Sequence, residues 1–286
     1  MQIQLMTDSS ADLPIELKEK LNIKTTPLYV HFGKEQYASE ELDTFTYFQK
    51  IRKAADFPSS AAPGPHVYYE RFKEVPTDHA IIFMGISEGI SSAYNNAVMG
   101  MNLLLEEQPE RKIEIINTKT ASPGLILLLD EAGQKIAEGY SFDALVEHLY
   151  NRVEHTVTLF ILKTLENLVR GGRLDKMKGA IAKTLNIKLL LYADENGQIE
   201  VMEKVRGDKK AIRRFIAHIG EYVSSAEDRV LTLTHCQARE RADYIIEEIK
   251  KKYPFKQTIL SEIGPVISTH AGEGGIVISF FKDKLD

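Results

Sequence analysis

Four short loops, rich in glycine or hydroxyl side chains, each follow a segment with strand character and carry the residues best suited to chemistry. They are Thr7–Ser10, Ser87–Ser92, Arg170–Arg173 and Thr269–Gly272. In an open α/β sheet the loops at the carboxyl ends of the strands converge on a crevice, where a serine at a helix start offers an anion both its hydroxyl and a backbone N–H. We therefore expect these four loops to form one anion site.

A serine hydrolase is one chemistry that this pattern allows. The segment Gly85–Gly89 matches the Gly-x-Ser-x-Gly pattern around the nucleophile of α/β-hydrolases, and His270 follows Ser87 in the required chain order. Too few strands precede Ser87 for that fold, however, and no aspartate or glutamate stands out as the third catalytic residue. A polar turn in which Ser91 or Ser92 caps the next helix is the simpler alternative, because it needs no ligand.

A second polar candidate is His270, which lies in the segment Gly264–Gly275 between two predicted strands. This segment contains four glycines and one proline, and such a loop lets the backbone approach a ligand closely. An imidazole there can donate a hydrogen bond to an anion whether it is neutral or charged. A surface histidine in a flexible turn is the alternative.

Positive charge gathers in the second half of the chain. Arg170 and Arg173 flank a pair of glycines, and Arg206 precedes a predicted helix, so these three arginines could meet a phosphate or the carboxylates of a partner. The basic residues within the helix that starts at Lys209 have a different explanation. They lie opposite an apolar face and are expected to be solvated.

Composition excludes several classes of protein. The 286 residues are 43% hydrophobic and 27% charged, which indicates a globular chain long enough for two domains. A net charge of −5 argues against broad nucleic-acid binding. The single cysteine, Cys236, has no partner for an internal disulfide, and the polar N-terminus does not resemble a signal peptide. The longest apolar run, Leu125–Leu129, is too short to cross a membrane. We expect a cytoplasmic protein that is not inserted in a membrane.

Two further kinds of site are not supported by residue spacing. The eight histidines are not spaced along one helical face, and the pair His235-Cys236 has no second pair, so no metal site is predicted. A phosphate- or nucleotide-binding module is a third alternative to consider. The chain has neither the P-loop nor the dinucleotide-binding spacing of glycines that this alternative would favour.

The first half of the chain alternates strands and helices. Strands are predicted at residues 3–6, 24–31, 79–84 and 113–117, and helices at residues 15–21, 44–54, 91–106 and 123–137. The three prolines of Phe57–Pro65 predict a loop. This alternation is typical of a parallel sheet, so residues 1–155 are expected to form a Rossmann-like α/β domain.

The second half shows a different pattern. Strands are predicted at residues 156–161, 187–193, 198–205, 229–234, 257–263 and 275–281, and helices near residues 165 and 181 and over residues 209–223 and 238–251. Asp194–Gly197 separates two of these strands and predicts a hairpin with Asn-Gly in the turn. Residues 156–286 are therefore expected to form a mixed α+β domain, with the His270 loop and the basic surface.

Five segments, taken together and in order, resemble the DegV family over nearly the whole chain. They are Thr7–Leu13, Ile86–Tyr94, Leu168–Leu174, Lys204–Ala211 and Gly264–Gly272. The resemblance implies a two-domain bacterial protein that binds one long-chain fatty acid. It also implies that the protein presents this fatty acid to a separate ATP-dependent fatty acid kinase, which makes acyl phosphate for phospholipid synthesis. On this interpretation the chain is a non-catalytic carrier subunit with no cofactor, and the serine hydrolase using Ser87 and His270 is the alternative.

The resemblance also assigns roles to individual residues. The family's serine that holds the fatty acid carboxylate corresponds to Ser91, and a family threonine near it corresponds to Ser60. The family's histidine near the carboxylate corresponds to His270. Its arginines for kinase docking and phosphotransfer correspond to Arg173 and Arg206.

This sequence departs from the family pattern at several of these positions. Ser92-Ala93 stands where the family has Gly-Thr, Glu88 where it has serine, Asn117 where it usually has aspartate, and Glu273 where it has proline. Ser92 adds a hydroxyl and keeps its backbone N–H, so it joins the residues expected to bind the carboxylate. The acyl chain of the fatty acid would supply most of the affinity. The residues that line its binding site cannot be chosen from sequence, because they resemble ordinary core residues.

Overall fold

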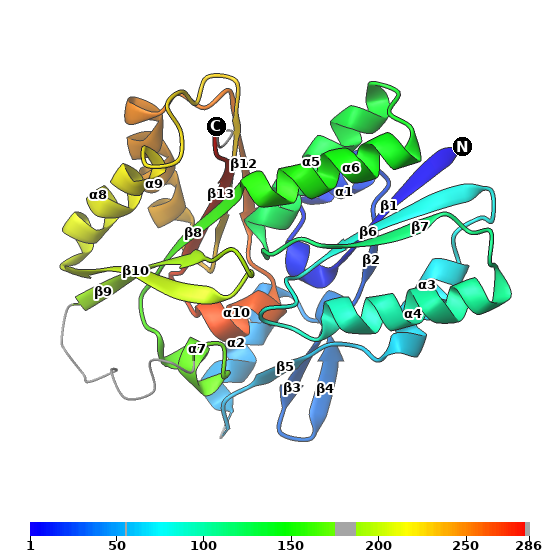
Figure 1. Cartoon of the computed structure of the whole chain (residues 1–286). Helices are drawn as coiled ribbons and strands as arrows, with labels where there is room; N and C mark the ends of the chain where they lie inside the picture. Colours follow the sequence, from blue (N-terminus) through cyan, green and yellow to red (C-terminus); the bar gives the residue numbers. More distant parts are fainter. Residues whose placement is uncertain (55, 175–186, 284–286) are drawn as a thin grey trace.

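The computed structural model describes residues 1–54, 56–174 and 187–283, which form an α/β fold built on a parallel sheet and a mixed sheet (Figure 1). The parallel sheet has four strands in the order β2-β1-β6-β7, and the mixed sheet has six in the order β10-β9-β8-β13-β11-β12. A small antiparallel sheet, β4-β3-β5, lies beside them. The predicted α/β fold class is confirmed.

The parallel sheet is covered on both faces, as its apolar strands require. Its strands are β1 (Gln2–Asp8), β2 (Lys24–Thr26), β6 (His79–Gly85) and β7 (Ile113–Asn117). The flanking helices are α1 (Ile15–Lys20), α3 (Pro65–Lys73), α4 (Ala93–Glu107), α5 (Pro123–Ala137) and α6 (Phe142–His155). Alternate residues of β6 divide between the two faces. Ile81 and Phe83 pack with α3 and α4, whereas Ile82 and Met84 pack with α5 and α6.

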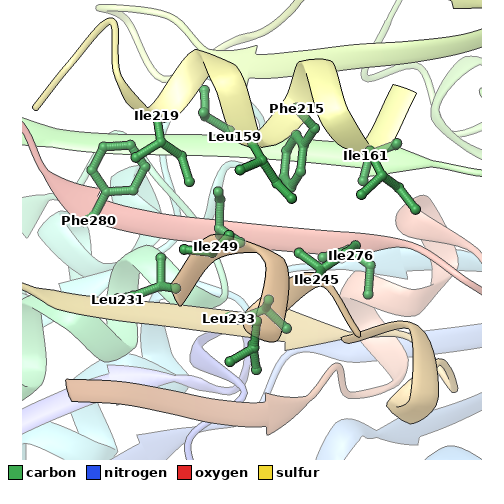
Figure 2. Close-up of a cluster of buried hydrophobic side chains, with 14 of the residues drawn as sticks. Leu159, Ile161, Phe215, Ile219, Leu231, Leu233, Ile245, Ile249, Ile276 and Phe280 are labelled. Carbon is green, nitrogen blue, oxygen red and sulfur yellow. The ribbon is translucent and has the colours of Figure 1, made fainter. Parts of the chain in front are cut away.

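The mixed sheet carries two helices on one face. Its strands are β8 (Thr156–Leu162), β9 (Ile187–Ala193), β10 (Ile199–Arg206), β11 (Val230–His235), β12 (Gln257–Glu262) and β13 (Ile276–Phe281). Figure 2 shows how α8 (Asp208–Ile219) and α9 (Arg239–Lys252) bury Phe215 and Ile249 against these strands. On the opposite face the Thr232 hydroxyl donates to the carbonyl of Pro123 on α5 at 2.8 Å. Helix α5 therefore lies between the two large sheets, which explains why Leu125–Leu129 is buried throughout.

The remaining elements gather near the small sheet. They are η1 (Ser9–Ala11), β3 (Tyr29–Phe32), β4 (Glu35–Ala38), η2 (Ser39–Glu41), α2 (Thr44–Lys53), β5 (Ser59–Ala61), α7 (Glu166–Arg170) and α10 (Pro265–Ala271). Tyr47 of α2 is fully buried, and its hydroxyl lies 2.9 Å from that of Thr269 on α10. Strand β5 pairs with β3, and α10 contacts both of these strands and α7. These contacts bring three distant parts of the sequence together.

Three local predictions are wrong. Residues 24–31 form two strands, β2 and β3, which belong to different sheets. The predicted loop Phe57–Pro65 contains β5, since its prolines lie outside the three paired residues and Pro65 begins α3. His270 lies in α10 and not in a loop. Pro265 begins this helix, and no glycine interrupts the sequence before Gly272, which ends it.

Other predictions hold or are untested. Strands β9 and β10 form the predicted antiparallel hairpin, in which Gly197 has a φ of +69°. The predicted helix near residue 181 lies outside the described residues. No helix in the described part of the chain is both long and apolar enough to span a bilayer. Strand β8 begins at Thr156, and the division of the chain near residue 155 remains a prediction.

Candidate functional site

A cavity of about 330 Å³ lies at the carboxyl ends of β6 and β7 and reaches to β8, β13 and α10. Most of its wall is apolar. The apolar lining residues are Leu28, Ala61, Ala62, Ile86, Ile90, Ala121, Phe160, Leu162, Leu168, Ala193, Ile199, Val266, Ile267, Ala271 and Val277. A wall of this kind removes water from an apolar ligand, which is the main source of affinity in such sites.

Polar side chains from four separate segments also line this cavity. Ser60 comes from β5, Ser91 and Ser92 from the loop between β6 and α4, Arg173 from the turn after α7, and His270 from the last turn of α10. Five of the seven residues predicted for the site therefore lie in one cavity. We refer to these five residues as the polar cluster.

Within the polar cluster, His270 and Ser60 are hydrogen-bonded. The distance from Nε2 of His270 to Oγ of Ser60 is 2.8 Å. Burial, with a smaller contribution from the positive charge of Arg173, lowers the pKa of His270 to about 4. The imidazole is therefore neutral at physiological pH. His270 is half-buried in the cavity wall, so it is not the surface histidine in a flexible turn that the sequence left as an alternative.

Arg173 is held by backbone oxygens on both sides. Its Nε donates to the carbonyl of Ile90 at 3.1 Å, and its Nη1 donates to the carbonyl of Gly171 at 2.6 Å. Burial lowers the pKa of the guanidinium from its usual value, but an arginine remains charged at neutral pH. Arg173 therefore places a fixed positive charge beside the imidazole.

The two serines before α4 do not cap the helix in the predicted way. Helix α4 begins at Ala93, and Ser92, at the N-cap position, makes no capping hydrogen bond with its side chain. Oγ of Ser91 accepts a hydrogen bond from the backbone N–H of Ala93 at 3.2 Å. Accepting this bond leaves the hydroxyl hydrogen of Ser91 able to donate to a ligand in the cavity.

Two of the predicted arginines lie outside the cavity. Arg170 pairs with Glu166 at 2.5 Å, and its guanidinium lies over the ring of Phe57, 5.5 Å from the centroid. Arg206 is exposed at the end of β10. The amphipathic face predicted for α8 is confirmed, since its lysines and arginines are exposed and Ile212, Phe215 and Ile216 are buried.

The first of the four loops also does not contribute to the cavity. In the segment Thr7–Ser10, the Ser10 side chain bonds to the buried carboxylate of Asp8, and Oγ of Ser9 accepts the backbone N–H of Leu28 at 2.9 Å. Both serines thus bond to the protein itself, and neither lines the cavity. The expectation that all four loops form one anion site is wrong for this loop.

The hydrolase alternative receives no support from the position of Ser87. This residue is fully buried, and its hydroxyl donates to the carbonyl of Gly197 at 2.9 Å while accepting the N–H of Gly89 at 3.0 Å. Among the hydrogen bonds of the described residues, none joins Ser87 to His270. Ser87 instead attaches the tip of the β9–β10 hairpin to the loop after β6.

Sequence reasoning missed three polar residues of the wall, which come from two segments. Thr120 and Ser122 line the cavity from the loop after β7, and Thr158 lines it from β8. The hydroxyls of Thr120 and Thr158 lie 2.7 Å apart. The available signal was position, since this loop also follows a parallel strand and therefore ends at the same edge of the sheet.

Ser122 connects the cavity wall to a half-buried carboxylate. Its hydroxyl donates to Oδ2 of Asp12 at 2.5 Å, and Oδ1 of Asp12 accepts the N–H of Gly264 at 2.8 Å. Burial raises the pKa of Asp12 from 3.8 to about 7, although both hydrogen bonds act in the opposite direction. Asp12 thus joins the parallel sheet to the start of α10.

This pKa makes a prediction about stability and pH. Because the folded-state pKa of Asp12 is raised, the folded protein holds a proton between about pH 4 and pH 7 that the unfolded chain releases. The contribution of Asp12 to the free energy of unfolding should therefore fall as pH rises through this window, whereas that of His270, whose pKa is lowered, should rise. In Asp12→Asn, urea denaturation at several pH values should therefore show a free energy of unfolding that rises more, or falls less, with pH than in the unchanged protein.

A suitable control carboxylate has the opposite shift. Hydrogen bonds from Thr46, first from its side chain and then from its backbone, lower the pKa of Asp43 at the start of α2. Asp43 therefore stabilises the fold above its unfolded pKa, and this contribution is lost as pH falls. Asp43→Asn should leave the pH dependence of the free energy of unfolding between pH 4 and pH 7 unchanged. The prediction for Asp12 would be contradicted if Asp12→Asn and the unchanged protein showed the same pH dependence in this window.

Comparisons with known proteins agree on one family. The family model for DegV, whose members are named as uncharacterised proteins, matches residues 2–283. A DegV domain-containing protein of Lactococcus lactis subsp. lactis, YteA, is 31% identical over an alignment of 286 positions that covers 97% of each chain. The chain is therefore similar to this relative over almost all of its length.

Two solved structures extend the similarity to the fold. A DegV family protein of Ruminococcus gnavus, refined with vaccenic acid, has a TM-score of 0.91 and 28% identity, and the match covers 98% of this chain and 99% of that one. The Fatty Acid Kinase (Fak) B3 protein of Streptococcus pneumoniae, loaded with linoleic acid, has a TM-score of 0.88 and 26% identity. That match covers 99% of this chain and 100% of the other.

The fold and the cavity define a class of protein, namely an α/β protein with two large sheets and an apolar pocket that carries a polar cluster. The family match makes the assignment specific. The chain belongs to the DegV family.

Proposed function

We propose that this protein binds one long-chain fatty acid in the cavity, with the carboxylate at the polar cluster and the acyl chain along the apolar wall. The observation that carries this proposal is the coexistence of 15 apolar lining residues with Ser60, Ser91 and His270 in one cavity. Relatives of the same fold are loaded with linoleic acid or refined with vaccenic acid, which supports the choice of ligand.

The two ends of the ligand have different energetic roles. Burying an acyl chain of about 16 carbons at ~0.8 kcal/mol per methylene contributes roughly 12 kcal/mol before association costs are subtracted. A carboxylate removed from water must be hydrogen-bonded, or its desolvation would cancel much of this gain. The hydroxyls of Ser60, Ser91 and Ser92 supply donors. The tail therefore sets most of the affinity, and the head fixes the orientation.

We further infer that the protein is a non-catalytic carrier that presents the carboxylate to a separate ATP-dependent fatty acid kinase. The name of the Streptococcus pneumoniae relative, a fatty acid kinase B3 protein, supports a partner of this kind. A carboxylate oxygen would attack the γ-phosphorus of ATP, forming the acyl phosphate as the bond to ADP breaks. Arg173 lies at the cavity and Arg206 is exposed, so they are our candidates for phosphotransfer and docking. Arg170 is a third candidate for contact with the partner.

Two further proposals concern organisation and location. We assign the cavity loops of the first half to a domain of residues 1–155 and the Arg206 surface with His270 to a domain of residues 156–286. We infer a cytoplasmic location, because an ATP-dependent kinase must work where ATP is supplied. Acyl phosphate made there would feed phospholipid synthesis.

The experiment that tests the carboxylate site is Ser91→Ala. Loss of a hydrogen bond to a charged group should weaken palmitate binding by about ten- to a hundred-fold, measured by isothermal titration calorimetry. Ser59→Ala is the matched control, because Ser59 is the exposed neighbour of Ser60 on β5 and does not line the cavity. Unchanged palmitate affinity in a folded Ser91→Ala protein would show that the head group lies elsewhere.

The partner proposal needs a variant that separates binding from phosphorylation. Arg206→Ala should bind palmitate as the unchanged protein does, since Arg206 is outside the cavity. With a fatty acid kinase and ATP, it should form acyl phosphate about ten times more slowly, because an interface charge is lost. Equal rates of acyl phosphate formation for the two proteins would show that Arg206 is not part of the docking surface. The proposal that the protein binds a fatty acid would not be affected by that result.

A further inference from the structure

Two adjacent glycines follow α7, and each is required for a different reason. Gly171 has a φ of −73°, which any residue adopts, whereas Gly172 has a φ of +72°, which favours glycine. A Cβ atom on Gly171 would lie 2.5 Å from Nδ1 and 2.8 Å from Cε1 of His270, but a Cβ on Gly172 would have nothing within 4 Å. Gly171 therefore provides space for the imidazole, and Gly172 provides a backbone conformation.

The contacts of the imidazole indicate which nitrogen carries its proton. Nε2 lies 2.8 Å from Oγ of Ser60, and Nδ1 is buried without a hydrogen-bond partner among the described residues. A buried N–H without an acceptor is costly, so the proton of the neutral ring belongs on Nε2. Nε2–H then donates to Ser60, and the hydroxyl hydrogen of Ser60 is left free to point at a ligand in the cavity.

The same turn also positions the neighbouring charge. The carbonyl of Gly171 accepts a hydrogen bond from Nη1 of Arg173 at 2.6 Å. The positive charge of Arg173 helps to keep the imidazole neutral, as burial does. Gly171 therefore leaves room for the imidazole because it has no side chain, and its carbonyl binds the guanidinium.

We propose that Gly171 is a positioning residue of the carboxylate site, because its missing side chain allows His270 to direct the hydroxyl of Ser60 toward the ligand. This inference rests on the proposed fatty acid site and goes beyond it. Gly171 does not touch the ligand. It acts through His270, which acts in turn through Ser60.

The test is Gly171→Ala in the full-length protein, with palmitate as the probe. The added methyl group should displace the imidazole from Ser60 and weaken palmitate binding about ten-fold, the effect of one lost hydrogen bond to a charged group. ¹⁵N NMR of the histidine side chains provides a second readout, with the His270 signals assigned by their absence in His270→Ala. The unchanged protein should show a protonated Nε2, and Gly171→Ala should change that pattern.

A double-mutant cycle separates positioning from general damage. Once His270→Ala has removed the imidazole, Gly171→Ala should change palmitate affinity by less than about two-fold, because the added methyl group no longer meets the ring. Gly172→Ala is the matched control. It strains the adjacent backbone without entering the space of the ring, so it should lower stability and leave the His270 signals unchanged.

Each outcome bears on the inference. If Gly171→Ala is too unstable to purify, recovery of folded protein in the double variant would support the inference, and failure to recover it would overturn it. Unchanged affinity with an unchanged imidazole spectrum would also overturn it, as would an equal loss of affinity in both backgrounds. A failure of the unchanged protein to bind palmitate would instead refute the proposed function, which the binding data alone would reveal.

Discussion

Palmitate should bind this protein far more tightly than octanoate, by a factor of roughly 10⁴ to 10⁵. The two acids have the same head group, and palmitate has roughly eight more methylene groups, each contributing ~0.8 kcal/mol when buried. The apolar wall, which includes Phe160, Leu168 and Val277, is the surface that would bury them. Isothermal titration with both acids below their critical micelle concentrations measures this ratio directly.

The Ser91→Ala variant gives this measurement its control. Loss of the Ser91 hydroxyl should weaken the binding of both acids by a similar factor, so the ratio of their affinities should stay the same. Similar affinities for palmitate and octanoate in the unchanged protein would mean that the acyl chain does not enter the apolar cavity. The carboxylate proposal could then survive, but the fatty acid proposal could not.

Much of the fold could be predicted from the sequence because the largest elements have unambiguous patterns. Strand β6 contains an uninterrupted apolar run, and the first half of α5, Leu125–Leu129, is apolar throughout because it lies between two sheets. The Asn-Gly pair also predicts the β9–β10 hairpin correctly. In each case the local pattern and the tertiary environment favour the same structure.

The elements that were mispredicted are short and are stabilised by tertiary contacts. Strand β5 has only three residues, and it exists because β3 offers it a pairing edge. Helix α10 has seven residues, and it buries Val266 and Ala271 against the rest of the protein. Helices this short are marginal in isolation, so the sequence gives no clear local signal.

The grouping of side chains in the cavity also could not be predicted from local sequence, because it depends on tertiary contacts. Ser60 and His270 are 210 residues apart, and their hydrogen bond depends on how β5, α10 and α7 pack. The identities of the polar residues could be inferred from family motifs, but their grouping required the fold. The apolar wall could not be predicted, because a lining residue such as Phe160 is indistinguishable in sequence from a core residue.

A large loss of stability from a single added methyl group is expected at Gly197, the tip of the β9–β10 hairpin. Gly197 has a φ of +69°, and a Cβ atom there would lie 2.1 Å from Oγ of Ser87 and 2.7 Å from Cα of Lys119. Gly197→Ala should therefore strain the backbone and also push the hairpin away from the loops that it contacts. We expect a loss of about 3–5 kcal/mol in the free energy of unfolding, measured by urea denaturation.

A second hairpin glycine separates the cost of the backbone conformation from the cost of the steric contact. Gly33 lies between β3 and β4 with a φ of +58°, and a Cβ atom there would have nothing within 4 Å. Gly33→Ala should therefore lose only about 1–2 kcal/mol, the cost of the backbone conformation alone. The difference between the two variants then measures the steric contact between the hairpin and the loop after β6. If Gly197→Ala loses no more stability than Gly33→Ala, the hairpin tip is not packed against Ser87, and this part of the cavity wall is open.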